Sequence, residues 1–320
     1  MMMRLLEFAQ KFGTEQQCRE HFILQRKQTG VVCKKCKGTK HYWLEGKQQF
    51  QCATCSFRTC LKSGTLLEHS RMSFQYWYTA LYLMTYSKKG ISAKELQRQL
   101  GHKRYEPLWL MMHKIRSMMG KKDEQYKLTG AIEADGAYFE TLAAADQDKK
   151  CKRIKKIQYS RGKGSERVTT VLVMAESLPG QPDSRNTAHR NPMGQKLRYI
   201  RLRQLSGHQA SDVITAMRQS VDLQNTDVVT DMGTEMSAIK KMVRQHDKVH
   251  STPQNNNRHL HWVNIVIANA KTTILGVYHR ISSRYIQNYL NEFAYRTNRR
   301  FYGLDIFERL LNTAVINLYW

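Results

Sequence analysis

Residues 131–140 read Ala-Ile-Glu-Ala-Asp-Gly-Ala-Tyr-Phe-Glu, and residues 227–231 read Asp-Val-Val-Thr-Asp. Both stretches have the short apolar pattern of a buried strand, and each places an aspartate, Asp135 or Asp231, at or near the strand end. Open α/β sheets build their sites at the carboxyl ends of strands, and Mg²⁺ prefers carboxylate oxygens. The two aspartates are therefore candidates for one metal site, although an aspartate at a strand end is also a common turn or capping residue.

The chain from Gly130 onward alternates strands with helices. Strands are predicted at Ala131–Phe139, Val168–Ala175, Lys196–Leu205 and Val228–Thr230, and helices at Ser211–Ser220, Glu235–Gln245, Trp262–Leu275, Ser283–Arg296 and Ile306–Leu318. Residues 251–258, with their run of asparagines, are predicted to form a loop. This order predicts an α/β fold with a mixed sheet rather than a helical bundle.

Two cysteine pairs lie near the N-terminus. Cys33 and Cys36 form one Cys-x-x-Cys motif, Cys52 and Cys55 form a second, and fifteen residues separate the two. Four thiolates at this spacing are typical of a closed, structural Zn²⁺ site, and so small a module could scarcely fold without its metal. The three other cysteines are interpreted as small core residues; they are Cys18, Cys60 and Cys151.

Helices are predicted on both sides of this zinc ribbon. Residues 1–29 have the spacing of a helical entry segment, and residues 63–125 form a helical region after the ribbon of residues 30–62. Within that region, Ser92 to Glu95 fits a capping box, and Gly101 ends the short helix before a third one. This arrangement predicts a helix-turn-helix-like DNA-binding region, with an ordinary helical hairpin as the alternative.

The charge of the chain points to a polyanionic partner. Lys and Arg total 52 against 26 Asp and Glu, which gives a formal net charge of +26. Nucleic acid is the leading candidate, because there is neither an apolar run of about 18 residues for a membrane span nor a signal peptide. A cytoplasmic protein is expected. The basic segment from Lys152 to Arg167 is predicted to follow a DNA backbone, with a solvated charge run as the alternative.

Asn264 and Lys271 lie seven residues apart, so about two helical turns place them on one face of the predicted helix. Residues 131–140, the run Thr230-Asp231-Met232-Gly233, residues 259–279 and residues 289–300 together resemble a bacterial insertion-sequence transposase domain. The preceding zinc ribbon and helical hairpin match the same group, so that the resemblance spans nearly the whole chain.

The resemblance implies an RNase H-like catalytic domain of the DDE type over residues 126–300, followed by a C-terminal helix over residues 301–320. It implies that Asp135 and Asp231 bind catalytic Mg²⁺ or Mn²⁺. Asn264 would take the position where most DDE enzymes have Glu, 33 residues after Asp231, and Lys271 would face a DNA phosphate. An amide oxygen can bind a hard cation without bringing a charge, so Glu235 and Glu292 stay open as alternative third acids.

The function that the resemblance implies is transposition: binding of double-stranded DNA at the element ends, metal-dependent cleavage, and joining of the 3′ hydroxyl to target DNA. A homodimer or higher oligomer on DNA is expected, because two ends must be processed, and so is a location at the bacterial nucleoid. Two alternatives stay open at this point. One is a catalytically inactive DNA-binding relic of a transposase, and the other is a metal-dependent nuclease without strand transfer.

Overall fold

The computed structural model describes residues 4–87, 89–142, 165–180, 195–207, 209–279 and 281–315. Cys151 and most of the basic segment predicted to follow DNA, up to Gly164, lie outside these residues. The chain divides into two compact units: residues 1–122 with 301–320, and residues 123–300. Within the described residues, no helix combines the length and apolar character needed to cross a bilayer.

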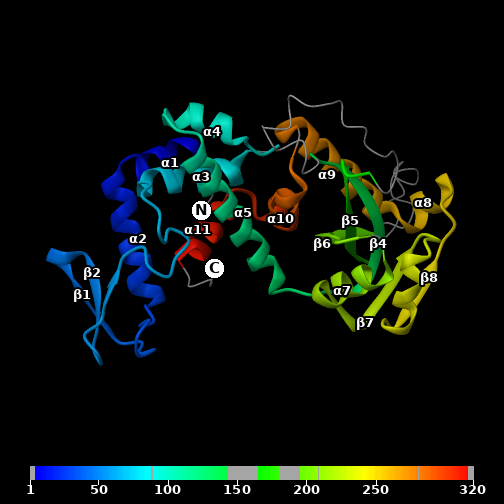
Figure 1. Ribbon diagram of the computed structural model, residues 1–320, viewed down its shortest axis with the longest axis horizontal. Helices are drawn as coiled ribbons and strands as arrows, with labels where there is room; N and C mark the ends of the chain where they lie inside the picture. Colours follow the sequence, from blue (N-terminus) through cyan, green and yellow to red (C-terminus); the bar gives the residue numbers. More distant parts are fainter. Residues whose placement is uncertain are drawn as a thin grey trace, which may run out of the picture. The chain divides into compact units, whose positions relative to one another are not determined.

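The first unit consists of helices and a small sheet (Figure 1). Its helices are α1 (Leu5–Phe12), α2 (Glu15–Thr29), α3 (Phe74–Tyr86), α4 (Ala93–Leu100), α5 (Glu106–Glu124, whose last residues belong to the second unit) and α11 (Ile306–Val315), with a 3₁₀ turn η1 (Glu45–Lys47). Its strands are β1 (His41–Leu44), β2 (Gln49–Cys52) and β3 (Arg58–Cys60), which form one antiparallel sheet. The ribbon is therefore built on a three-stranded sheet in the order β1-β2-β3.

Helix α11 completes the core of this first unit from the far end of the chain. The ring of Phe307 meets the rings of Phe8 and Tyr82 edge-on, with centroids 5.5 and 5.6 Å apart. The buried guanidinium of Arg26 in α2 donates to the carbonyl of Val315 at 3.3 Å. The aromatic packing and this hydrogen bond join helices α1 and α2 to helix α11 in one core.

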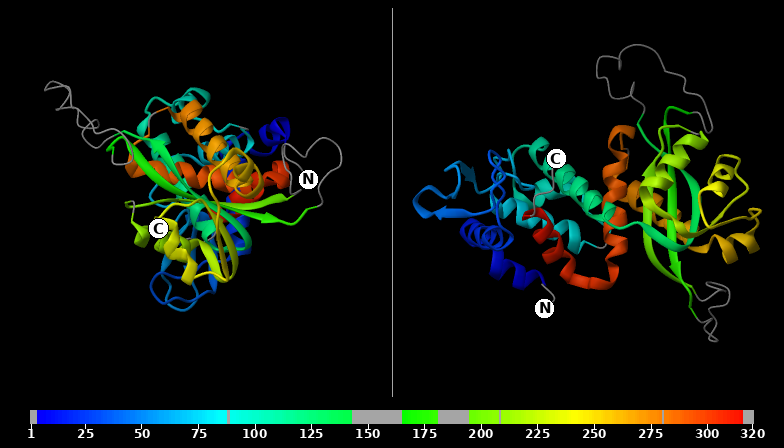
Figure 2. Two further views of the ribbon diagram at one scale, coloured as in Figure 1. Left: turned by 90° about the vertical axis from the view of Figure 1, so that its right-hand side faces the viewer. Right: turned by 90° about the horizontal axis from the view of Figure 1, so that it is seen from below.

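The second unit is built on a five-stranded sheet in the order β6-β5-β4-β7-β8. The strands are β4 (Leu128–Glu140), β5 (Val168–Leu178), β6 (Lys196–Gln204), β7 (Val221–Thr230) and β8 (Gln245–Lys248). Strands β4, β5 and β6 pair antiparallel, whereas β7 and β8 are parallel to β4, and the strands twist across the sheet (Figure 2). This is the mixed sheet expected of an RNase H-like domain.

Helices cover both faces of this sheet. The elements are α7 (Ala210–Ser220), η3 (Glu235–Lys241), α8 (Pro253–His259), α9 (His261–Tyr278), η4 (Ser283–Tyr285) and α10 (Ile286–Asn298). The 3₁₀ segment η5 (Arg300–Asp305) follows, and all of it but Arg300 belongs to the first unit. Apolar side chains of α9 and α10 pack against one face, and those of α7 and η3 pack against the other. The strand period of two explains the division: Ala137 and Phe139 face α9, while Ile132 and Ala134 face α7.

Two local predictions are wrong. The helix expected at Glu235–Gln245 is a 3₁₀ segment that ends at Lys241, and the chain then forms edge strand β8. The loop expected at residues 251–258 is largely helix α8, where Thr252 caps the first turn and Pro253 takes the first helical position. A proline needs no hydrogen-bond partner there, so the Thr-Pro pair starts a helix despite the asparagines that follow it.

Candidate active site

The pairing of β4 with β7 brings the two predicted aspartates together. These strands are parallel neighbours, and Ala134 pairs with Thr230 at the end of the ladder. Asp135 follows Ala134 within β4, and Asp231 directly follows the last residue of β7, so that the strand period places them on the side of Glu133 and Val229. The two carboxylates therefore stand side by side where β7 ends.

Asp135 is half-buried, and Oδ1 accepts a hydrogen bond from the amide of Gly136 at 2.7 Å. Burial, and after it the charge of Asp231, raises the pKa of Asp135 to about 6. The amide of Gly136 and the ammonium of Lys271 act in the opposite direction, while Glu235 raises this pKa further. Asp135 thus lies within the electrostatic reach of two acids and one lysine.

Asp231 is held by the turn that follows it. Its Oδ1 accepts from the amide of Gly233 at 3.0 Å, and a Cβ at Gly233 would lie 2.9 Å from that oxygen and 3.5 Å from Oε2 of Glu235. Because Gly233 has no Cβ, the carboxylates of Asp231 and Glu235 can both lie close to its backbone, which a larger residue would obstruct. A cavity of about 90 Å³ opens here, and Asp135, Asp231 and Glu235 line it.

Helix α9 brings the other two predicted residues to the same face of the sheet. Lys271 is half-buried, with Nζ 6.0 Å from the centroid of the Phe139 ring on β4. Asn264 is also half-buried; its Nδ2 donates to the carbonyl of Leu260 at 2.7 Å, which fixes the amide plane. Among the described residues that line the small cavity, α9 contributes none. The structure brings Asp231 and Lys271 within electrostatic reach of Asp135, whereas the side-chain hydrogen bond of Asn264 is with Leu260 at the start of its own helix.

The two alternative third acids stand in different surroundings. Glu235 lines the cavity with both aspartates. Glu292 is 2% exposed within α10 and accepts a hydrogen bond from the hydroxyl of Tyr278 at 3.0 Å. The geometry therefore favours Glu235 over Glu292 as a further acid of this site.

Glu133 is a functional candidate to which the sequence analysis assigns no role. It is 5% exposed between β4 and α9, and its Oε2 accepts from the backbone amide of Val263 at 2.9 Å. Burial raises the pKa of Glu133 to about 7, against the lowering effect of the amides of Val263 and Trp262. The sequence does place Glu133 on the same strand face as Asp135. It does not indicate the hydrogen bond to Val263, because that residue lies 130 positions away in the chain.

The four predicted zinc ligands come together in the first unit. Their ligand atoms all lie within 4.8 Å of one another, with Sγ of Cys36 3.4 Å from that of Cys52 and Sγ of Cys33 3.6 Å from that of Cys55. Tetrahedral zinc with Zn–S bonds of about 2.3 Å needs sulfurs at nearly this spacing. No other group of three or more Cys, His, Asp or Glu ligand atoms is so close among the described residues.

The two halves of this cluster repeat one local geometry. Lys37 donates its amide to the carbonyl of Cys33, and Ser56 donates to that of Cys52, each at 3.0 Å. Both Lys37 and Ser56 have positive φ, which closes each Cys-x-x-Cys turn tightly. The cluster is consistent with one structural Zn²⁺.

A basic cleft lies on the helical part of the first unit. This cavity of about 350 Å³ lies between residues 69–72, the turn after α4 and the first turns of α5. Arg71 and Arg104 are exposed at its edge, and Lys114 donates from inside it to the carbonyl of Glu68 at 2.7 Å. We call this cavity the basic cleft.

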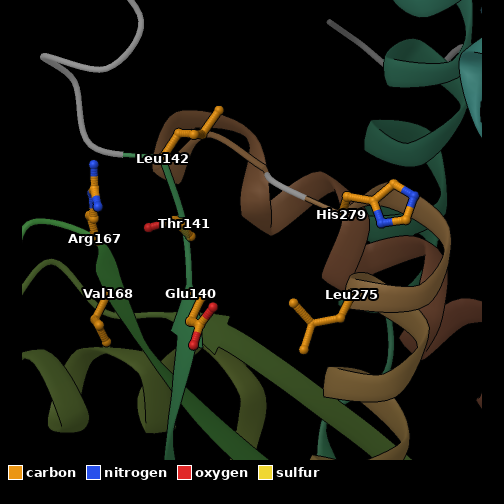
Figure 3. A pocket seen from close by; sticks show the side chains of 7 residues that line it. All are labelled: Glu140, Thr141, Leu142, Arg167, Val168, Leu275 and His279. Atoms are coloured by element: carbon orange, nitrogen blue, oxygen red, sulfur yellow. The ribbon is translucent and has the colours of Figure 1, made fainter.

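A larger cavity of about 460 Å³ lies farther along the seam between β4 and α9 (Figure 3). It is lined by Glu140, Thr141, Leu142, Arg167, Val168, Leu275 and His279. Glu140 is five residues beyond Asp135 on β4, so about 16 Å of extended strand separates the two. The paired acids that metal-dependent chemistry needs lie at the smaller cavity, which makes that cavity the candidate active site.

Family models of known proteins match both the part of the chain that contains the paired aspartates and the part that contains the four cysteines. The family model described as ISXO2-like transposase domain matches residues 127–298, and the one described as transposase zinc-ribbon domain matches residues 13–58. No curated protein matches the chain. Among solved structures, the chain is similar to one titled "Crystal structure of a pre-cleavage Mos1 transpososome", with 9% identity over 76% of this chain and 79% of that one. The TM-score of 0.24 is too low for that likeness to carry an argument.

Proposed function

Because the chain belongs to the family of the ISXO2-like transposase domain, we propose that it is an active DDE-type transposase. It binds the ends of its own insertion sequence, cleaves them and joins the freed 3′ hydroxyl to target DNA. The observation that carries this proposal is the register of β4 and β7, which sets Asp135 beside Asp231.

The residues present suit a hard divalent cation such as Mg²⁺ or Mn²⁺. Asp135 and Asp231 offer carboxylate oxygens. The raised pKa of Asp135 reflects burial first and then repulsion by Asp231, and a bound cation would relieve that repulsion. Asn264 offers a neutral oxygen, because its Nδ2 is engaged with Leu260. Asp135, Asp231 and Asn264 would hold the cation, which when bound would supply activation of the attacking oxygen and stabilisation of the leaving oxygen.

The side chains of the protein itself position the DNA. Lys271 faces the strand that carries Asp135, where its ammonium can pair with a phosphate near the scissile bond. No protein nucleophile is required, since water or a 3′ hydroxyl attacks the phosphorus in line. The first unit, with its basic cleft and the zinc ribbon, recognises the element end and contacts phosphates. Two ends in one reaction require at least two copies of the chain on DNA.

Site-directed variants of the two aspartates test this proposal. The purified protein is incubated with Mg²⁺ or Mn²⁺ and a linear duplex that carries the ends flanking its own gene, and cleaved and joined products are resolved on a gel. Asp135→Asn and Asp231→Asn are expected to lose both products while they keep binding DNA. Asp227→Asn is the matched control, because Asp227 lies on the same strand and pairs with Arg244 at the surface.

The outcomes separate the alternatives. Products that persist in both aspartate variants would overturn the assignment of the site. Cleavage by wild type without any joined product would identify a nuclease, and intact DNA binding without either product would identify an inactive relic.

A further inference from the structure

Helix α9, which carries Asn264 and Lys271, begins without a capping side chain of its own. Leu260 stands at the position before the first helical residue, and no side chain there bonds to the first turn. Backbone amides in the first turn of a helix have no partner within the helix, and a leucine cannot provide one. The start of α9 therefore depends on a partner from elsewhere in the fold.

Glu133 provides that partner from the neighbouring strand. Its carboxylate lies buried between β4 and α9, and Oε2 accepts from the amide of Val263 at 2.9 Å. A buried carboxylate is costly unless donors surround it, and the positive end of a helix dipole is a favourable place for one. Glu133 thus serves as a cap delivered across the interface between strand and helix.

This contact connects the two halves of the active site. Glu133 stands two residues before Asp135 on the same face of β4, and Val263 immediately precedes Asn264 on α9. Two turns farther along the helix, Lys271 lies over Phe139 of the same strand. The helix is thereby held to β4 at points on either side of Asp135, and the hydrogen bond of Glu133 holds it at the residue next to Asn264 in the chain.

We propose that Glu133 is a positioning residue: its hydrogen bond to the start of α9 sets where Asn264 stands relative to Asp135 and Asp231. Glu133 itself binds neither metal nor DNA in this role. The inference rests on the proposed function, because it concerns the metal site of that function.

The test compares two substitutions of nearly equal size, Glu133→Gln and Glu133→Met. Glutamine keeps an oxygen that accepts the amide proton of Val263, whereas methionine fills the space without an acceptor. The measurement is the Mn²⁺ affinity of the full chain without DNA, obtained by calorimetry. We expect Glu133→Gln to stay within about threefold of wild type and Glu133→Met to bind about tenfold more weakly, as is common when an outer partner of a metal site is lost.

The same pair of substitutions in an Asn264→Ala background separates positioning from general damage. If Glu133 acts through Asn264, Glu133→Met weakens Mn²⁺ binding little further once the amide of Asn264 is gone. Equal weakening in both backgrounds would overturn the inference, and so would equal loss in Glu133→Gln and Glu133→Met. Glu140→Gln, an exposed acid on the same strand, is the matched control and is expected to leave the affinity unchanged.

Two further measurements keep failures distinguishable. Amide hydrogen exchange over residues 260–266 is expected to be faster in Glu133→Met than in Glu133→Gln, and an unchanged rate would also overturn the inference. If Asp135→Asn leaves Mn²⁺ affinity unchanged, the proposed metal site itself fails. If Asp135→Asn weakens binding while Glu133→Met does not, the positioning role alone fails.

Discussion

The charge of the active site depends on which side chain joins Asp135 and Asp231 at the metal. With Asn264 as the third ligand, its amide oxygen would bring no charge, so two carboxylates alone would face the cations and the DNA phosphates. Glu235 lines the same cavity and raises the pKa of Asp135 through its own charge. A third negative charge close to the cation strengthens binding, because affinity in such oxygen-ligand sites depends on the number of charged ligands.

Substitution of Glu235 tests this contribution directly. Glu235→Gln is expected to weaken Mn²⁺ binding by about tenfold, through the loss of one charge next to the two aspartates. The affinity is measured by calorimetry on the free protein. Glu292→Gln serves as the comparison: it leaves Mn²⁺ affinity unchanged and lowers the melting temperature, because the buried acceptor for Tyr278 is altered. The reverse ranking would make Glu292 the third acid.

The sequence predicts the two aspartates for a simple reason: a strand displays alternate residues on one face, and a strand end is visible in the residue pattern. That both face one cavity follows from the register of β4 and β7, which the sequence alone does not determine. The hydrogen bond between Glu133 and Val263 joins residues 130 positions apart, so no local pattern indicates it. Asn298 is a similar case, since this buried amide accepts from the amide of Ile200 on β6 at 2.7 Å.

At the scale of elements, the zinc ribbon depends on its metal for stability. A small three-stranded sheet with few buried side chains cannot offset the entropy of folding without a cross-link. Cys36→Ser is therefore expected to lose zinc and to expose residues 41–60 to rapid hydrogen exchange, with the second unit unaffected. Zinc content is measured by atomic emission, with about one zinc per chain expected in wild type.

Cys60→Ser is the matched control for this experiment. Cys60 lies on β3 of the same sheet and stands outside the cluster of four sulfurs. It is exposed, so its interpretation as a core residue is wrong, whereas Cys18 is buried as predicted. Zinc retained in Cys36→Ser, or lost in Cys60→Ser, would contradict the assignment of the ligands.

The basic cleft leads to a prediction about salt. Arg71 and Arg104 present exposed guanidinium groups at the basic cleft. When each of them neutralises a phosphate of a DNA duplex, the counterions condensed on that phosphate are released. The double variant Arg71→Ala/Arg104→Ala should reduce the magnitude of the slope of log K for DNA binding against log salt concentration by about two. The reduction should be similar for end DNA and for unrelated DNA. Fluorescence anisotropy with a labelled duplex gives the slope.

Arg98→Ala tests whether any lost positive charge has the same effect. Arg98 lies on α4 and donates from Nη2 to Glu95 at 2.9 Å, so its charge is already paired. An unchanged slope is expected for this variant. If the double variant also leaves the slope unchanged, the basic cleft does not contact phosphates.

One of the two misplaced regions, the segment that ends in β8, has a conformation that depends on a neighbouring element. β8 has the polar sequence Gln-His-Asp-Lys without apolar alternation, and it is a strand because its backbone pairs with the edge of β7. The long, strongly apolar elements, such as β5 and α9, need no such help and lie close to the predicted positions. Burial patterns therefore predict the core of the sheet but leave its edge undetermined.

At the scale of the whole molecule, burial shifts the pKa values of histidines and of acids in opposite directions. In the first unit, burial lowers the pKa of His21 to about 4 and that of His113 to about 3. In the second, burial raises the pKa of Glu133 to about 7 and that of Asp135 to about 6. All four groups favour the neutral form in the folded protein.

These shifts have opposite consequences for the pH dependence of stability. A histidine with a lowered pKa contributes stability that is complete above its unfolded pKa of about 6.5 and is lost as the pH falls towards 4. A carboxyl with a raised pKa contributes stability that is complete below its unfolded pKa of about 4 and is lost as the pH rises through 6 to 7. Acid should therefore destabilise the first unit through its histidines, and the metal-free second unit should weaken towards pH 8 through these acids.

We expect the free energy of unfolding of the second unit, measured by native-state hydrogen exchange with a chelator present, to decrease between pH 5 and pH 8. Over this pH range Glu133 contributes on the order of 2 to 3 kcal/mol to the decrease and Asp135 on the order of 1 kcal/mol. His246 and His261, whose pKa values burial lowers, oppose it. The difference between wild type and the Glu133→Gln/Asp135→Asn double variant cancels the histidines and isolates the two acids. In the proposed site, Mg²⁺ would bind Asp135 in its ionised form, and so should stabilise wild type more at pH 8 than at pH 5. A pH-independent difference between the two proteins would contradict the buried state of both acids.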